Sequence, residues 1–303
     1  MVALRHVPGD AAEVVCKLEW YNPGGSVKDR IALAMIEAAE AEGRLGPGGT
    51  IVEATSGNTG IGLAIVAARR GYRLVLAMPD DMNAERRALF AWFGVELLLT
   101  PAIEAMGGAV FAAEEIVRSR SAFWPRQFEN PANPAAHERT TGPELLRQCG
   151  GRIDALVAGV GTGGTLTGTA RFLKRHLPSL HVVAVEPARS PVLSGGRPGP
   201  HRLLGLGAGF VPGVLDRSLI DRVLPCTDED GFETARQLAC REGLLAGPSA
   251  GAAAWAALQV AAELGRGRRV AVILPDGGDR YSSLLPWALR RDGDRLRLGE
   301  SAG

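Results

Sequence analysis

The pattern of apolar and polar positions alternates between two kinds of segment along the chain. Short apolar runs rich in β-branched residues predict strands, at 14–18, 51–54, 73–78, 95–99, 154–159, 181–185 and 269–274. Apolar residues at helical spacing lie between them and predict helices, at 27–43, 58–70, 83–93, 105–119, 164–177, 231–243 and 250–264. Near-continuous apolar strands separated by amphipathic helices are typical of parallel sheets covered on both faces. The pattern therefore predicts an α/β fold.

Three stretches interrupt this alternation. Three prolines fall within 125–135, and we place a boundary between two α/β domains there, with an N-terminal domain at 1–132 and a C-terminal domain at 133–303. The stretch 187–215 is rich in glycine and proline, which predicts a long functional or mobile loop. The last dozen residues are polar and predict a frayed tail.

Composition narrows the possible functions. The formal net charge of +1 provides no basic surface for nucleic acid or for an acidic membrane, and no apolar run reaches the roughly 18 residues of a membrane span. The four cysteines lie far apart without a Cys/His cluster, so we expect no metal site and no disulfide framework. The N-terminus lacks the pattern of a secretory signal. We expect a cytoplasmic protein.

The segment Gly159–Thr165 reads GVGTGGT between a predicted strand and a predicted helix. Its glycines, with Glu186 at the end of the next strand, match a dinucleotide-binding fingerprint. Small residues at a helix N-terminus also let backbone N–H groups approach an anion, and the hydroxyls of Thr162 and Thr165 suit a phosphate monoester. A tight turn without a ligand is the structural alternative. The dinucleotide and the phosphate monoester interpretations both predict that this segment binds phosphate.

Only three residues of the chain are lysines, and one of them has an unusual setting. Lys28 follows the turn sequence NPGGS, in which Ser26 is a predicted N-cap. The helix dipole disfavours a cation in the first turn, so the amine of Lys28 is a candidate for Schiff-base chemistry. An exposed surface lysine is the alternative. Lys17 and Lys174 have no comparable setting.

Two further helix starts carry small hydroxyl residues. The segment 53–60, EATSGNTG, suits a second anion such as an amino-acid carboxylate, although a capping motif explains it equally well. In GPSAG at 247–251, Ser249 has an N-cap as its alternative interpretation. We interpret His137 as a structural hydrogen-bonding residue.

Taken together, these segments resemble the cysteine synthase (O-acetylserine sulfhydrylase) branch of the fold-type II pyridoxal-phosphate enzymes, which also contains the cystathionine β-synthases. The resemblance rests on seven motifs in family order: NPGGSVKDR (22–30), EATSGNTG (53–60), MPDDMNAERR (78–87), QFENPANPAAHERTTGPE (127–144), GVGTGGTLTG (159–168), GAGFVPGVLD (207–216) and GPSAG (247–251). It implies a tryptophan synthase β-like fold of two three-layer αβα domains with mostly parallel sheets. Residues 32–132 would form the smaller mobile part, 1–31 would pack on the larger domain, and the C-terminal domain would carry the phosphate loop.

The resemblance also implies roles at the matching positions. Lys28 would bind pyridoxal 5'-phosphate as a Schiff base and move the substrate's α-proton, and Asn58 would contact the cofactor's phenolate oxygen. The substrate carboxylate would be bound by Thr55, Ser56, Thr59 and Gln127. The cofactor phosphate would be bound by Gly161, Thr162, Gly163, Gly164 and Thr165. Ser249 would meet the pyridine nitrogen, and a hydroxyl there favours loss of a β-substituent.

The function implied is a cysteine synthase, which converts O-acetyl-L-serine and sulfide to L-cysteine and acetate. The alternatives are a cystathionine β-synthase or another β-replacement on serine or phosphoserine. From other classes, an NAD-dependent oxidoreductase and a non-catalytic regulatory homologue remain. The family further implies a homodimer and a partner in the C-terminal tail of serine acetyltransferase.

Overall fold

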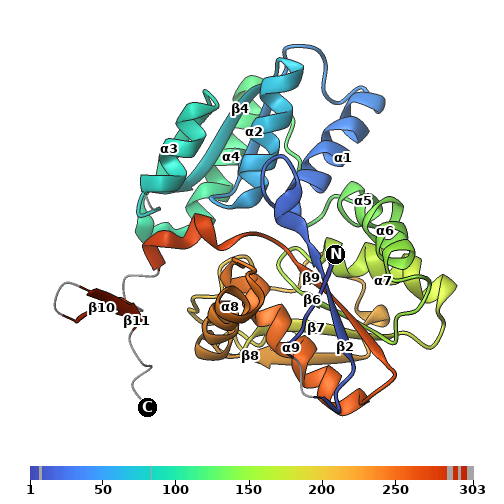
Figure 1. The fold of residues 1–303 in the computed structure, drawn as a ribbon. Helices are drawn as coiled ribbons and strands as arrows, with labels where there is room; N and C mark the ends of the chain where they lie inside the picture. The colour runs from blue at the N-terminus through green and yellow to red at the C-terminus, as the bar shows by residue number, and fades with distance from the viewer. Residues whose placement is uncertain (7–8, 83, 285–288, 293–294, 299–303) are drawn as a thin grey trace.

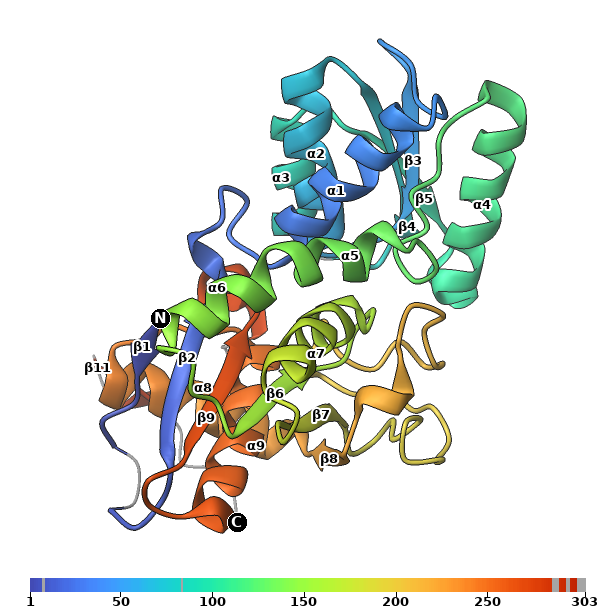
Figure 2. The ribbon, with the colours of Figure 1, turned by 90° about the vertical axis from the view of Figure 1, so that its right-hand side faces the viewer.

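The computed structural model describes residues 1–303 except for 7–8, 83, 285–288, 293–294 and 299–303. The chain forms two α/β units, a smaller one above a larger one in Figure 1, and Figure 2 shows the separation between them from the side. Within the described ranges, no helix has the length and apolar character needed to cross a membrane.

The smaller unit is a three-stranded parallel sheet with helices on both faces. Its strands are β3 (Thr50–Ala54), β4 (Arg73–Pro79) and β5 (Glu96–Thr100), in the order β3-β4-β5. Its helices are α1 (Lys28–Ala41), α2 (Asn58–Arg70), α3 (Ala84–Trp92) and α4 (Ala105–Arg120). Ile36, Leu63 and Phe90 of the first three helices are buried on one face of the sheet. Ala109 and Ala113 of α4 are buried on the other face.

The larger unit is a six-stranded sheet in the order β1-β2-β9-β6-β7-β8, parallel except where β1 meets β2. Its strands are β1 (Val2–Ala3), β2 (Glu13–Leu18), β6 (Ala155–Gly159), β7 (His181–Pro187), β8 (Arg222–Cys226) and β9 (Arg269–Leu274). Its helices are α5 (Ala132–Arg139), α6 (Thr141–Gln148), α7 (Gly164–His176), α8 (Asp228–Glu242) and α9 (Pro248–Leu264). Leu238 of α8 and Ala257 of α9 are buried against one face, and Leu145 of α6 and Leu166 of α7 against the other.

Smaller elements complete the chain. These are the 3-10 helices η1 (Glu19–Tyr21), η2 (Ala102–Glu104), η3 (Arg217–Leu219) and η4 (Gly278–Leu284), and a hairpin of β10 (Leu289–Asp292) and β11 (Arg295–Leu298). The predicted 187–215 loop is present, because the chain has no helix or strand between the end of β7 and η3.

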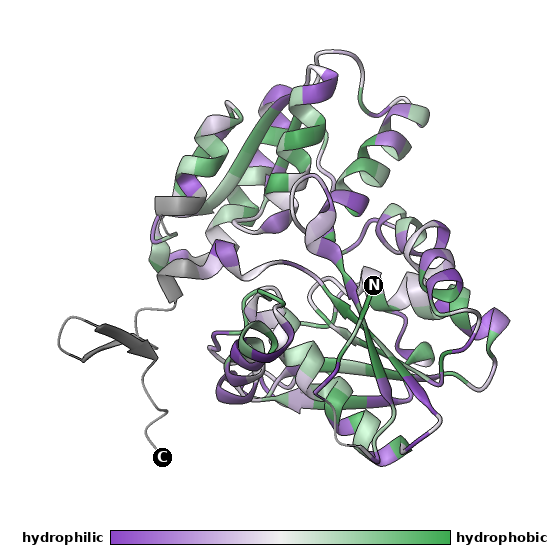
Figure 3. Cartoon of the chain, in the orientation of Figure 1, coloured by the Kyte–Doolittle hydropathy of each residue, from purple (hydrophilic) through white to green (hydrophobic). Residues whose placement is uncertain are grey.

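The strands have the predicted character. β3 and β6 are almost entirely buried, and Figure 3 shows apolar residues concentrated in the two sheets and on the helix faces toward them. Burial on both faces removes the need for alternating polar residues, which is why these strands read as continuous apolar runs. The structure therefore has the predicted architecture of two three-layer αβα units with mostly parallel sheets.

Several helices and strands of the structure differ from those that the sequence pattern predicts. α5 and α6 carry Pro134 and Pro143 in their first turns, where proline is tolerated although it suggests a break. α8 begins at Asp228, earlier than predicted, because the hydroxyl of Thr227 accepts a hydrogen bond from the N–H of Asp230 at 3.0 Å. The prediction of a frayed tail is wrong for Arg295–Leu298, which pair with β10. The rest of that tail, apart from Asp292, lies outside the described residues.

The loops that follow β2, β3, β6 and β9 meet between the two units. Val27, after β2, donates its N–H to the carbonyl of Pro275 after β9 at 2.8 Å. Asn58, after β3, donates to Asp276 after β9 at 2.6 Å. In open parallel sheets, ligands bind at the carboxyl ends of the strands, so this junction is where a site is expected.

Candidate active site

Lys28 is the first residue of α1 and directly follows Val27, which is bound to the turn after β9 at the junction of the two units. Ser26 is not its N-cap as predicted, because the helix begins one residue later with Val27 at the cap position. The hydroxyl of Ser26, itself fully buried, instead accepts a hydrogen bond from the Lys28 N–H at 3.2 Å. Burial lowers the pKa of the Lys28 amine, and the negative charges of Asp276 and Glu19 partly oppose this. A lowered pKa favours the neutral, nucleophilic amine.

The other two lysines are paired with carboxylates. The ammonium of Lys17 lies 2.8 Å from Glu144, and that of Lys174 lies 2.9 Å from Asp221. Each side chain is already bound to a carboxylate, so neither is positioned as a nucleophile. This agrees with the predicted order of the three candidates.

The glycine-rich loop lies between β6 and the N-terminus of α7. Gly163, just before the helix, has φ of +84°, which favours glycine. A Cβ at Gly161 would come within 2.2 Å of the carbonyl oxygen of Gly205, and one at Gly164 within 1.8 Å of Oδ1 of Asn133. Only glycine fits these positions. The first turn of α7 leaves backbone N–H groups without intrahelical partners, so it can act as an anion cradle.

Both threonine hydroxyls of this loop are oriented by buried side chains. Thr162 accepts a hydrogen bond from the amide of Asn133 at 3.1 Å, and the hydroxyl of Thr165 lies 3.2 Å from Nε2 of His137. Nδ1 of His137 lies 2.8 Å from the hydroxyl of Thr141. Burial lowers the pKa of His137 well below its ordinary value, and the charges of neighbouring cations lower it further. His137 is thus a neutral hydrogen-bonding residue, as interpreted from the sequence.

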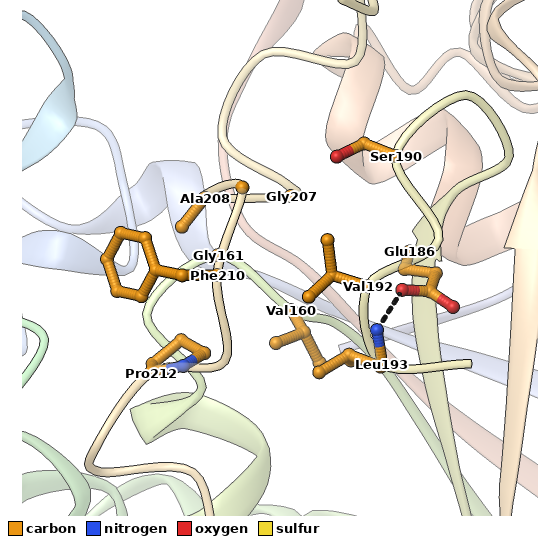
Figure 4. A pocket seen from close by; sticks show the side chains of 11 residues that line it. Val160, Gly161, Glu186, Ser190, Val192, Leu193, Gly207, Ala208, Phe210 and Pro212 are labelled. Carbon is orange, nitrogen blue, oxygen red and sulfur yellow. Dashed lines mark hydrogen bonds between the residues drawn. The ribbon is translucent and has the colours of Figure 1, made fainter. Parts of the chain in front are cut away.

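Glu186 does not face a ribose-sized space. Its carboxylate accepts a hydrogen bond from the N–H of Leu193 at 2.7 Å (Figure 4). It also accepts from the N–H and the hydroxyl of Ser194 at 3.0 and 2.5 Å. The cavity that it lines with Val160 and Gly161 measures about 10 Å³, room for about one water molecule. Glu186 therefore binds the first part of the 187–215 loop. Its carboxylate is not available to a ribose hydroxyl, which is evidence against the dinucleotide interpretation.

A second cluster of small polar residues forms where β3 leads into α2. Asn58 begins α2, with Gly57 as its N-cap. Thr55, Thr59 and Gln127 are buried, and the hydroxyl of Thr59 donates to Oε1 of Gln127 at 2.5 Å. Ser56 lies at the same turn and is partly exposed. The fold thus brings Gln127 to the predicted anion site of the 53–60 segment, although 68 residues separate it from Thr59.

Sequence reasoning missed the turn that follows β9. Asp276, Arg280 and Tyr281 of this turn surround Asn58. Oδ2 of Asp276 accepts from the Asn58 amide at 2.6 Å and from the Tyr281 hydroxyl at 2.5 Å, and Arg280 donates to Oδ1 of Asn58 at 2.9 Å. The available signal was the segment PDGGDRY directly after a predicted parallel strand, since the carboxyl ends of such strands share one edge.

Ser249 lies in the first turn of α9 and is buried. Gly247 is the N-cap of this helix, so the interpretation of Ser249 as an N-cap is wrong. A Cβ at Gly205 would lie 3.5 Å from the Ser249 hydroxyl. Since Gly205 also borders Gly161, the start of α9 adjoins the glycine-rich loop.

Comparisons with known proteins agree with this arrangement. The family model described as "Pyridoxal-phosphate dependent enzyme" matches residues 3–276. A cysteine synthase of Staphylococcus aureus is 57% identical over 285 residues, which cover 93% of this chain and 92% of the relative. A cysteine synthase structure from Entamoeba histolytica has a TM-score of 0.91 and 37% identity, covering 96% of this chain and 88% of that one. An O-acetylserine-dependent cystathionine β-synthase structure from Helicobacter pylori has a TM-score of 0.85 and 40% identity, covering 91% of each chain.

Proposed function

The chain belongs to the family of pyridoxal-phosphate-dependent enzymes, and on this premise we propose that it is a cysteine synthase. The reaction replaces the acetate of O-acetyl-L-serine with sulfide and gives L-cysteine. The observation that carries this proposal is the 57% identity to a cysteine synthase over nearly the full length of both chains. Membership of the family makes pyridoxal 5'-phosphate the cofactor, which removes the NAD-dependent oxidoreductase from consideration.

The residues at the junction of the two units fit this cofactor. The N-terminal turn of α7 can bind one phosphate, and close contacts with the Gly205 carbonyl and with Asn133 require glycine at 161 and 164 in the loop before it. Lys28 supplies an amine with a lowered pKa. Oδ1 of Asp276 is buried and has no hydrogen-bond partner among the described residues, which leaves one acceptor available for a bound group near Lys28.

When bound, pyridoxal phosphate supplies an electron-withdrawing ring that weakens the Cα–H bond of an amino acid attached to it. The amine of Lys28 would hold the cofactor and, once released by the substrate's amino group, would accept the α-proton of the substrate. The backbone of 161–165 would hold the phosphate, and Asn58 would contact the phenolate oxygen. Ser249 would face the ring nitrogen with a neutral hydroxyl, which favours departure of acetate from Cβ together with the proton.

The substrate carboxylate would bind at the start of α2. The hydroxyls of Thr55, Ser56 and Thr59 lie at a helix N-terminus, which favours a negative charge. The amide of Gln127 adds a donor from the opposite side of this subsite. Binding there would orient the substrate's Cα toward Lys28, and closure of 32–132 over the carboxylate would exclude water from the reaction.

A second candidate within the same cofactor class is an O-acetylserine-dependent cystathionine β-synthase. It is favoured by the 40% identity to the Helicobacter pylori protein of that name. The two functions differ in the acceptor, sulfide or homocysteine, and serine or O-phosphoserine would be the alternative donors.

The family resemblance also supports proposals about the oligomeric state and the cellular location of the protein. We propose a cytoplasmic homodimer with domains 1–132 and 133–303, in which 1–31 packs on the larger domain. β2 within the larger sheet supports the last point. The C-terminal tail of serine acetyltransferase is the proposed protein partner, and binding of that peptide in competition with O-acetylserine would support it.

The visible absorption spectrum of the purified protein tests the proposed function. A yellow band that changes when O-acetylserine is added, and returns when sulfide is added, would support the cysteine synthase. Return with homocysteine but not with sulfide would favour the second candidate. A band indifferent to O-acetylserine would point to serine or O-phosphoserine as donor. No band after incubation with pyridoxal phosphate would refute the proposal.

A further inference from the structure

Glu53, at the end of β3, is a buried carboxylate that the mechanism above does not use. Only 3% of the residue is exposed. Oε1 accepts hydrogen bonds from the indole N–H of Trp124 at 3.0 Å and from the N–H of Ala54 at 3.1 Å. Oε2 accepts from the backbone N–H of Gln127 at 3.4 Å. One carboxylate therefore connects the strand that leads to Thr55 with the loop that carries Gln127.

The loop follows β3 closely before it reaches Glu53. Phe123 donates its N–H to Thr50 at 2.8 Å and accepts from Val52 at 2.9 Å, so the chain enters the loop as an extra parallel partner of β3. Arg126 then takes a φ of +52°, in the left-handed region that is unfavourable for a non-glycine residue. The backbone N–H groups of Arg126 and Gln127 both act on the Glu53 carboxyl group, and successive N–H groups of this kind can bind an anion. The anion that they bind here is the carboxylate of Glu53.

Gln127 is consequently held at three points. Its N–H is bound by Glu53, its carbonyl accepts from the amide of Asn133 at 2.8 Å, and its side chain accepts from Thr59 at 2.5 Å. Asn133 also contacts Thr162 of the glycine-rich loop at 3.1 Å. The substrate subsite and the phosphate cradle are therefore joined through Gln127.

We propose that Glu53 is a positioning residue for substrate binding, which holds the 124–127 loop on β3 so that the Gln127 amide faces the substrate carboxylate. The proposal depends on the proposed function only for the identity of the ligand, which is the substrate carboxylate. An apolar side chain could fill the same space, but it could not accept three N–H groups. Burial raises the pKa of Glu53 to about 7, against the hydrogen bonds from Trp124 and the backbone. An ionisable side chain therefore occupies this buried position although burial disfavours its charged form.

A double-mutant cycle on the holoenzyme tests the proposal. Glu53→Gln keeps the volume but places an N–H₂ group against backbone donors, and we expect KM for O-acetylserine to rise about tenfold with kcat changed far less. Because Glu53 acts through Gln127, adding E53Q to Gln127→Ala should raise KM by less than about twofold. Trp124→Phe removes the indole N–H that Glu53 accepts, together with part of the ring, and should raise KM by a smaller factor. Additive effects of E53Q and Q127A on KM would overturn the proposal.

Hydrogen–deuterium exchange supplies a readout that does not depend on the substrate. E53Q should accelerate exchange of the amides in 124–128, and unchanged exchange there would overturn the proposal even if KM rises. Glu186→Gln is the matched control, since Glu186 is 1% exposed and also accepts three hydrogen bonds, but within the 187–215 loop. It should leave exchange at 124–128 unchanged. If the wild type fails to react with O-acetylserine, the proposed function fails, while the exchange comparison still decides the role of Glu53.

Discussion

A cluster of four charges anchors the start of α1, and its Glu144 offers the clearest stability prediction. The carboxylate of Glu144 on α6 lies 2.8 Å from the ammonium of Lys17 and 2.7 Å from the guanidinium of Arg30, which also binds Glu19 at 2.7 Å. Burial raises the pKa of Glu144, but the hydrogen bonds from Arg30 and Lys17 outweigh it and bring the pKa down from 4.5 to about 2. Arg30 stands two residues after Lys28, so this cluster fixes the helix that carries the reactive amine.

Glu144→Gln removes the charge and keeps a hydrogen-bond acceptor. A pKa of about 2 instead of 4.5 corresponds to about 3 kcal/mol of stability at neutral pH. Because 29% of the Glu144 side chain is exposed, solvent screening reduces the expected loss to about 2 kcal/mol. The folded-state pKa is the lower one, so the contribution is present above pH 4.5 and disappears as the pH falls toward 2. By pH 3, less than half of the difference between wild type and E144Q should remain.

Urea unfolding followed by tryptophan fluorescence at pH 7 and at pH 3 measures both quantities. Glu263→Gln is the control, because Glu263 forms an exposed ion pair with Arg222 and should cost less than about 1 kcal/mol at either pH. A destabilisation by E144Q that is equal at the two pH values, or no larger than that of E263Q, would refute the electrostatic reasoning.

Three further substitutions test the site and its packing. Lys28→Ala should abolish the covalent attachment of the cofactor and reduce turnover by at least about 10²-fold, measured by the visible spectrum and by sulfide consumption. Gly161→Ala places a Cβ within 2.2 Å of the Gly205 carbonyl and should weaken binding of pyridoxal phosphate at least about tenfold in a fluorescence titration, a change too small to detect being the contrary result. Gly251→Ala places a Cβ within 2.1 Å of the main chain of α8 and should lower the free energy of unfolding by about 1–3 kcal/mol. Gly107→Ala, in α4, is the control, because a Cβ at Gly107 would lie in open space and should leave stability unchanged or raise it. Equal losses of unfolding free energy from Gly251→Ala and Gly107→Ala would contradict the packing argument.

The sequence predicted the features that depend on neighbours along the chain. A strand buried on both faces is recognisable because its own residues form a continuous apolar run. The glycine-rich turn before α7 and the lysine at the start of α1 are also local signals, because a positive φ and a helix dipole act on single residues or one helical turn. Local rules also produced the errors. Serine is a residue type favoured at N-caps, but α1 and α9 begin at Lys28 and Pro248, with Val27 and Gly247 at the cap positions in place of Ser26 and Ser249.

The grouping of residues into one site was decided by the tertiary structure. Thr59 and Gln127 meet because the loop after α4 adds to β3, and Glu53 receives that loop through backbone N–H groups that no side-chain pattern reveals. Asn58 and Asp276 meet across 218 residues because their strands belong to two sheets whose carboxyl ends face the same junction. The sequence by itself determined which residues can bind an anion, accept a proton or turn the chain, since these are properties of side chains and short segments. Which of them share a ligand depends on contacts distant in sequence, which only the packed sheets bring within hydrogen-bonding distance.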